Sequence, residues 1–241
     1  MAAVGIIGAS GFTGAELLRL CAAHPDLDVV VATGDSQAGT AVADLYPSLA
    51  AHYGDLTFAE VDDTTADGCD VVFLGLPHGA SQALVPDLAS RVGHVIDLAA
   101  DFRLRDAALY PEWYDEPHTA PGLLVDFAYG LPELYRRSIV GAPLIAVPGC
   151  YPTATSLALA PFVWGGHVEP SGLVVDAASG VSGAGRPRNP TPPSAPSTRT
   201  TPPTGWSATG TRRRWNRRSA RGPTARSSTT SRSCSLRTLR P

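Results

Sequence analysis

The strongest constraint on the fold lies near the start of the chain, where an apolar run ends in a glycine-rich turn. Residues 4–7 are apolar and precede Gly8, Gly11 and Gly14, and residues 15–21 then carry apolar side chains at helical spacing. A strand, a glycine turn and a helix in this order direct backbone amides and a helix N-terminus at a pyrophosphate. We therefore predict a dinucleotide-binding unit, although its glycines do not have the GxGxxG spacing. The alternative is a turn with only a structural role.

Further apolar runs at residues 27–32, 70–76, 94–98 and 144–147 predict strands, separated by segments that could be helices. Nearly continuous apolar strands are typical of a parallel sheet covered on both faces. The fold class is therefore α/β, with a Rossmann-like parallel sheet domain. Residues 99–143 are rich in Asp, Pro and aromatic side chains. They predict a connecting region that lines a cleft rather than another crossover unit.

Asp35 follows the second predicted strand, about 20 residues beyond the glycine turn. An acid at this place can bind a ribose hydroxyl of NAD, whereas an arginine would favour NADP. The alternative is that Asp35 caps a turn with its neighbours. The residues alone therefore leave the 2′ substituent of the cofactor open.

Cys150 has the surroundings of a nucleophile. It follows Pro148 and Gly149 at the end of a predicted strand and precedes a predicted helix at residues 153–162. A helix dipole at this place can lower the pKa of a thiol. The alternative is a buried structural cysteine. The other cysteines and the six histidines form no metal-ligand spacing, so we predict no metal site.

Several short motifs together give a more specific signal than any one alone. They are Gly-Ala-Ser-Gly-Phe-Thr-Gly at 8–14, Leu-Pro-His-Gly at 76–79, Asp-Leu-Ala-Ala-Asp-Phe-Arg at 97–103, Tyr-Gly-Leu-Pro-Glu at 129–133, Pro-Gly-Cys-Tyr-Pro-Thr at 148–153 and Ser-Gly-Val-Ser-Gly-Ala-Gly-Arg at 179–186. In this order, residues 1–186 resemble the N-acetyl-gamma-glutamyl-phosphate reductase family.

The resemblance implies a reductase of arginine biosynthesis in which Cys150 attacks an acyl phosphate and the resulting thioester is reduced by NADPH. It implies that the cofactor phosphates are held by Gly8, Ser10, Gly11, Thr13 and Gly14. It places Pro77 and Gly183 near the nicotinamide. Arg103 is a candidate for binding the substrate carboxylate or phosphate, with a surface salt bridge as the alternative.

The composition changes abruptly near Arg186. All 22 acidic side chains precede this point, whereas residues 187–241 contain 12 arginines, no acid and few large apolar side chains. We expect a dinucleotide-binding domain at 1–147, the start of an α+β substrate domain at 148–186 that is truncated, and a disordered tail at 187–241. A strand is predicted at 172–177.

The tail has the character of a shifted reading frame. The resemblance implies a His-Arg-His-Thr-Pro-Glu stretch some sixty residues after the cysteine, yet no histidine follows His167. Permitted codons for residues 206–218, read from the last base of the first codon, encode Val-Gly-His-Arg-His-Thr-Pro-Glu-Met-Glu-Gln. The same shift lets residues 194–205 encode Phe-Cys-Ser-Val-Asp-Glu-Asp-Tyr-Thr-Ala-Tyr-Gly. We therefore expect a frameshift shortly after Arg186.

Other interpretations stay open at this stage. The arginine-rich tail would also suit a non-catalytic dinucleotide-binding fragment with a basic interaction tail, although we expect no nucleic-acid partner. A related semialdehyde dehydrogenase would share the strand, cysteine and helix arrangement, and the chain as written would catalyse nothing if it lacks the histidine.

No apolar stretch approaches the roughly 20 residues of a membrane span, so we expect a soluble cytoplasmic protein whose partner is a small-molecule substrate. The resemblance implies a homo-oligomer, which the truncation makes doubtful for this chain.

Overall fold

A six-stranded sheet forms the centre of the fold, in the order β2-β1-β3-β4-β6-β5. The computed structural model describes residues 1–185, 204 and 205. The strands of this sheet are β1 (Ala2–Ile7), β2 (Leu27–Ala32), β3 (Val71–Leu74), β4 (His94–Asp97), β5 (Ala128–Tyr129) and β6 (Leu144–Ala146). Every neighbouring pair is parallel, as the apolar runs predicted.

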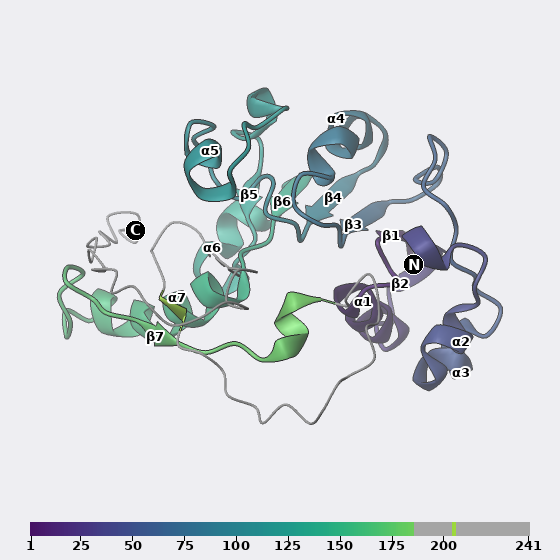
Figure 1. The fold of residues 1–241 in the computed structure, drawn as a ribbon, viewed down its shortest axis with the longest axis horizontal. Coiled ribbons are helices and arrows are strands. Elements are labelled where there is room, and N and C mark those ends of the chain that lie inside the picture. Colours follow the sequence, from purple (N-terminus) through teal and green to yellow (C-terminus); the bar gives the residue numbers. More distant parts are fainter. Residues whose placement is uncertain (186–203, 206–241) are drawn as a thin grey trace, which may run out of the picture.

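Helices cover both faces of this sheet, and Figure 1 shows α4 and α5 on one side and α1 on the other. The α-helices are α1 (Phe12–Ala22), α2 (Val42–Leu45), α3 (Ala50–Tyr53), α4 (Ser81–Arg91), α5 (Leu109–Tyr114), α6 (Pro132–Ile139) and α7 (Cys150–Trp164). Short 3-10 helices are η1 (Asp35–Gln37), η2 (Pro47–Leu49), η3 (Pro121–Leu123) and η4 (Val181–Ala184). The Rossmann-like architecture is therefore confirmed.

The side chains of β1 divide the core into two layers, because successive side chains of a strand point to opposite faces of the sheet. Ile6 packs in a cluster with Leu18 of α1. Ile7 packs in the other cluster, with Val85 of α4. Burial on both faces is what makes the central strands uniformly apolar in sequence.

The region at residues 99–143 differs from its prediction as a connecting region. It contains α5, η3, β5 and α6, and β5 pairs in parallel with β6, so the region adds an edge strand to the sheet. The strand is only two residues long, Ala128 and Tyr129. So short a segment has no periodicity that a sequence pattern could detect.

Beyond β6 the chain enters α7, which begins at Cys150, three residues before the predicted helix start. The strand predicted at 172–177 is reduced to β7 (Asp176–Ala177), which pairs antiparallel with β8 (Thr204–Gly205). Apart from this pair, the predicted disordered tail at 187–241 lies outside the described residues. Among the described helices, none is long and apolar enough to cross a membrane.

Candidate functional site

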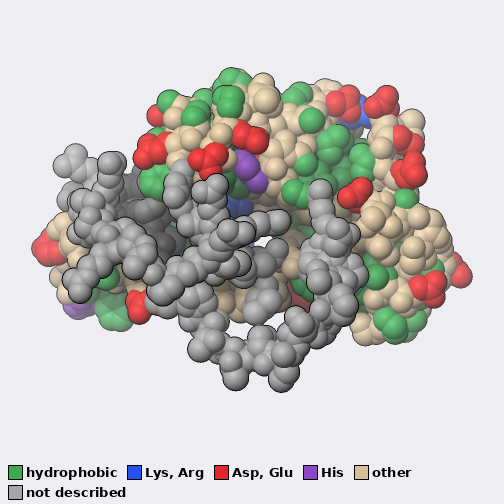
Figure 2. All heavy atoms as spheres, viewed as in Figure 1, with side chains coloured by type: hydrophobic (Ala, Val, Ile, Leu, Met, Phe, Trp, Pro, Cys, Tyr) green, Lys and Arg blue, Asp and Glu red, His purple; other side chains and the backbone are tan. Residues whose placement is uncertain are grey.

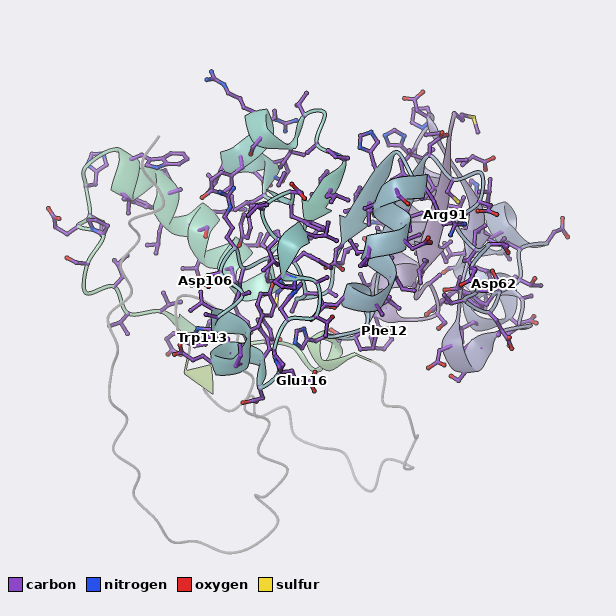
Figure 3. All side chains as sticks on the ribbon, turned by 90° about the horizontal axis from the view of Figure 1, so that it is seen from above. Phe12, Asp62, Arg91, Asp106, Trp113 and Glu116 are labelled. Atoms are coloured by element: carbon purple, nitrogen blue, oxygen red, sulfur yellow. The ribbon has the colours of Figure 1, made fainter. Side chains whose placement is uncertain are left out.

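Apart from Gly183, the predicted site residues follow the carboxyl ends of parallel strands: the glycine turn follows β1, Pro77 follows β3, Arg103 follows β4 and Cys150 follows β6. The strand order reverses at β1, with β2 on one side of it and β3 on the other. Because β1 and β3 are parallel neighbours, the glycine turn after β1 lies beside Gly75, which follows β3. In open α/β sheets, ligands bind beyond the carboxyl ends of strands at such a switch point. Figure 3 shows Phe12, Trp113 and Glu116 along one side of the molecule, the side that faces the viewer in Figure 1.

Two of the three turn glycines are required by the geometry. Gly8 has a φ of 87°, and a Cβ there would lie 2.6 Å from the carbonyl oxygen of Gly75. A Cβ at Gly14 would lie 2.3 Å from the Cα of Ala9. At Gly11, the residue before α1, the nearest atom would be 3.6 Å away, which is ordinary contact. The close approach of backbone to backbone leaves a cradle that fits a dinucleotide pyrophosphate.

Residues outside the glycine motif hold this turn in place. Thr33, at the end of β2, accepts hydrogen bonds from Gly8 N through its Oγ1 (3.0 Å) and from Ala9 N through its carbonyl (2.7 Å). Tyr46 donates its hydroxyl to the carbonyl oxygen of Ser10 at 2.6 Å. Neither residue was predicted from the sequence. The signal available for Thr33 was a threonine directly after the apolar run at residues 27–32.

The other predicted cofactor residues lie around this turn. Ser10 is half-buried, whereas Thr13 and Pro77 are exposed. Gly183 belongs to η4, which lies near the start of α1 in both Figure 1 and Figure 3. Asp35 is exposed and begins η1, and its carbonyl accepts a hydrogen bond from Ala38 N. This position is compatible with Asp35 binding a ribose hydroxyl of the cofactor and also with Asp35 capping a turn.

Cys150 is the first residue of α7 and directly follows Gly149, whose carbonyl accepts hydrogen bonds from the amide (3.0 Å) and hydroxyl (2.9 Å) of Thr153. Its thiol is exposed, whereas Cys21 and Cys69 are buried and burial raises the pKa of both. Among the cysteines that the structure describes, Cys150 is thus the one that a solvent-borne substrate can reach.

A buried polar cluster that the sequence analysis did not identify adjoins these loops. Asp101 is fully buried, and its carboxylate accepts hydrogen bonds from Gly79 N (2.8 Å) and from Ser81 N (2.9 Å) at the start of α4. His78 Nδ1 lies 2.5 Å from the same carboxylate. His78 belongs to the Leu-Pro-His-Gly motif and Asp101 to the Asp-Phe-Arg motif. Because the two residues belong to separate motifs, the sequence did not indicate that they contact each other.

Asp97, at the end of β4, is equally buried. Ser81 donates its hydroxyl to Asp97 Oδ1 at 2.8 Å, and Ala99 N donates to the same atom at 3.0 Å. Asp97 Oδ2 has no hydrogen-bond partner among the described residues. Burial raises the pKa of Asp97 to about 6, and the nearby Asp101 carboxylate adds to the rise.

Arg103 is half-buried and donates to the carbonyl oxygens of Ala99 (2.6 Å) and Leu98 (3.3 Å). No ion pair of Arg103 with a described carboxylate is present, so the surface salt bridge considered for it is not found there. Over residues 1–185, 204 and 205, no group of three His, Cys, Asp or Glu side chains is placed to hold a metal ion.

Comparison with known proteins adds family evidence to this geometry. The model of the semialdehyde dehydrogenase NAD binding domain matches residues 3–142, and that of the semialdehyde dehydrogenase dimerisation domain matches residues 150–201. The chain is similar to N-acetyl-gamma-glutamyl-phosphate reductase of Pseudomonas entomophila (strain L48), with 55% identity over 186 residues, which cover 77% of this chain and 54% of that protein. The identity to the reductase of Pseudomonas putida (strain W619) is 54% over the same shares.

The chain therefore spans about half the length of the curated relatives it matches. A solved aspartate semialdehyde dehydrogenase II from Vibrio cholerae has a similar fold, with a TM-score of 0.57, 20% identity and coverage of 77% of this chain and 48% of that one.

Proposed function

The chain belongs to the semialdehyde dehydrogenase family, and from that premise we propose that it carries the first half of an N-acetyl-gamma-glutamyl-phosphate reductase of arginine biosynthesis. The observation that carries this proposal is the exposed Cys150 at the first residue of α7, beyond the same sheet edge as the glycine turn. Identity of 54–55% to curated reductases over 186 residues supports the choice of substrate.

In the proposed reaction, the Cys150 thiolate attacks the acyl carbonyl carbon of N-acetyl-gamma-glutamyl phosphate. A carbon–sulfur bond forms, the bond to the phosphate oxygen breaks, and phosphate leaves with its electron pair. Transfer of a hydride to the thioester carbon and a proton to its oxygen gives a thiohemiacetal. Loss of that proton and cleavage of the carbon–sulfur bond release N-acetylglutamate 5-semialdehyde and restore the thiolate.

We propose NADPH as the cofactor, which when bound supplies the hydride. Gly8, Ser10, Gly11, Thr13 and Gly14 would hold its phosphates, and Pro77 and Gly183 would lie near its nicotinamide. The left-handed φ of Gly8 and the backbone contact at Gly14 support this cradle, because a side chain at either position would clash with the backbone that shapes the turn. Asp35 does not decide whether the site prefers the 2′ phosphate of NADP or the 2′ hydroxyl of NAD. Equilibrium binding of NADP and NAD to the same preparation would rank the two.

We propose that the residues after Arg186 are read in a neighbouring frame. The match to curated reductases covers 186 residues, and beyond them the chain holds neither an acid nor a histidine. The nucleotide sequence across codons 186–218 tests this proposal. It fails if the neighbouring frame does not encode His-Arg-His-Thr-Pro-Glu.

The enzymatic proposal is tested by comparing the chain as written with the product of a frame-restored gene. Both are assayed in reverse with N-acetylglutamate 5-semialdehyde, phosphate and NADP, and with aspartate semialdehyde as the competing substrate. We expect turnover only by the restored protein, preference for the N-acetylated substrate, and a loss of roughly 10³-fold or more in Cys150→Ser. Equal rates with aspartate semialdehyde would contradict the substrate assignment.

We also propose a cytoplasmic enzyme that assembles as a homo-oligomer through the segment that starts at α7. The dimerisation-domain match at residues 150–201 supports the assembly, and a domain boundary between residues 147 and 148 agrees with both domain matches. Light scattering of the restored protein tests the assembly, for which a monomer at micromolar concentration would be the contrary result.

A further inference from the structure

The strand order sets the path that a dinucleotide takes across the carboxyl edge of the sheet. The glycine turn follows β1, and Asp35 follows β2 on one side of it, whereas β3, β4 and β6 lie on the other side in that order. Cys150 begins α7 after β6. A nicotinamide that reduces a thioester on Cys150 must therefore reach from the glycine turn over the ends of β3 and β4. The loops after these two strands lie along its path.

The loop after β3 makes a tight turn before α4 begins. Ala80 N donates to the carbonyl oxygen of Pro77 (3.3 Å), and Gly79 has a φ of 91°. Pro77 and His78 are exposed, whereas Ser81, the first residue of α4, is fully buried. Figure 2 shows a side chain of the His type exposed near the middle of the face that Figure 1 views. The turn therefore presents its outer residues to solvent and is held from its buried side.

Asp101 holds this turn from the buried side. Gly79 N donates to its Oδ1 (2.8 Å), Ser81 N donates to its Oδ2 (2.9 Å), and His78 Nδ1 lies 2.5 Å from Oδ1. Burial would raise the pKa of Asp101, but the hydrogen bonds from His78 and Gly79 outweigh this effect and lower it. An ionised carboxylate accepts at both oxygens, which is what two backbone amides on either side of it require.

Asp97 links the same turn to the neighbouring strand ends. Ser81 donates its hydroxyl to Asp97 Oδ1 (2.8 Å), and Val147 N, directly after β6, donates to the carbonyl oxygen of Asp97 (2.8 Å). Val147 is followed by Pro-Gly and then Cys150. The turn after β3 and the loop of the candidate nucleophile are therefore joined through the end of β4. Within this frame, the Asp101 carboxylate sets the conformation of the turn.

We propose that Asp101 is a positioning residue for the nicotinamide end of the cofactor, because it fixes the turn at residues 77–81 over which the ring passes. The inference rests on the proposed function for the identity of the cofactor and for hydride transfer towards Cys150. Asp101 does not touch the cofactor, since its side chain is fully buried beneath the turn. A carboxylate that only caps the start of α4 would stabilise the fold without favouring either half of the cofactor.

NADPH is the probe, because the fluorescence of its reduced ring reports the surroundings of the nicotinamide, and 2′,5′-ADP represents the adenine half alone. We expect the whole chain to change the NADPH emission on binding. Asp101→Asn should lose most of this change and bind NADPH about fivefold more weakly, because an amide NH2 cannot accept a hydrogen bond from a backbone amide. Its affinity for 2′,5′-ADP should stay within about twofold of the wild type.

Asp70→Asn is the matched control, because its carboxylate also accepts a backbone amide, from Ala3 at 2.8 Å, but directly before β3. Gly79→Ala is a second variant, which leaves Asp101 intact. Its Cβ would have no neighbour closer than 3.8 Å, so the left-handed φ alone displaces the turn. It should produce the same selective loss. Gly68→Ala is its control, because Gly68 has a φ of 77° with nothing within 4 Å and lies before β3.

Equal losses of NADPH and 2′,5′-ADP affinity in a folded Asp101→Asn variant would overturn the inference and leave Asp101 as a helix cap. An unchanged emission response in that variant would overturn it too. If circular dichroism shows that Asp101→Asn does not fold, Gly79→Ala decides by the same two criteria. The measurement needs no turnover. Selective loss in a chain that does not act on N-acetylglutamate 5-semialdehyde would contradict the proposed substrate and leave this inference standing.

Discussion

Gly14 of helix α1 packs directly against the backbone of Ala9, where a Cβ on residue 14 would lie 2.3 Å from the Ala9 Cα. A Gly14→Ala substitution must therefore push the helix away from the turn. We expect a loss of about 1–3 kcal/mol in the free energy of unfolding, the usual cost of overpacking. Urea denaturation measures this loss. Gly11→Ala is the control, because its Cβ would meet its nearest neighbour at 3.6 Å. Equal losses in both variants would contradict the explanation.

Tyr46 should affect cofactor binding as well as stability. Its hydroxyl donates to the carbonyl oxygens of Ser10 (2.6 Å) and Gly11 (3.1 Å) in the glycine turn. We expect Tyr46→Phe to weaken NADP binding by about 1 kcal/mol, the net value of a hydrogen bond. Calorimetric titration measures this change. Tyr53→Phe is the matched control, because Tyr53 donates to Leu18 O in the middle of α1 and should alter stability alone. An unchanged affinity in Tyr46→Phe would refute the prediction.

Thiol accessibility separates Cys150 from the two buried cysteines of the described chain. In a Cys234→Ser background, iodoacetamide should modify one thiol quickly, and Cys150→Ser should abolish this fast phase. Cys21 and Cys69 should react only after unfolding, since burial both blocks them and raises their pKa. Mass spectrometry of the labelled peptides identifies the modified residue. Fast labelling of Cys21 or Cys69 would be the contrary result.

Asp97 should make stability fall as the pH rises. Burial raises its pKa from 3.8 to about 6, so between these values the folded state binds more protons than the unfolded state. Because proton binding is coupled to folding, the free energy of unfolding decreases from about pH 4 to pH 6, by at most about 3 kcal/mol. Asp101 has the opposite slope because its pKa is lowered from 3.8, so its contribution to stability is lost only as the pH falls below about 4.

Comparison with Asp97→Asn isolates the Asp97 contribution. Asparagine keeps the Oδ1 acceptor for Ser81 and Ala99 and replaces an Oδ2 that has no described partner. Urea denaturation at pH 4.5 and pH 7.5 should show the variant gaining stability relative to the wild type at the higher pH. If the free energy of unfolding of the variant differed from that of the wild type by the same amount at both pH values, Asp97 would not titrate in this range.

The sheet and the helices beside its first strands follow from short-range patterns, so they were open to prediction from the sequence. The apolar strands, the glycine turn and the cysteine at a helix start each involve residues that are close along the chain. The two-residue strand β5 escaped because so short an element has no period. The domain boundary and the roles of Cys150, Arg103 and the cofactor residues stay predictions.

By itself, the sequence determined where a dinucleotide turn and a candidate nucleophile can form, because backbone conformation and helix starts are local properties. Only the tertiary structure decided that His78 meets Asp101 and that Thr33 and Tyr46 hold the glycine turn. These partners are far apart in the chain. They meet because parallel strands bring their carboxyl ends to a single edge of the sheet, and burial there leaves each polar group dependent on a partner from another loop.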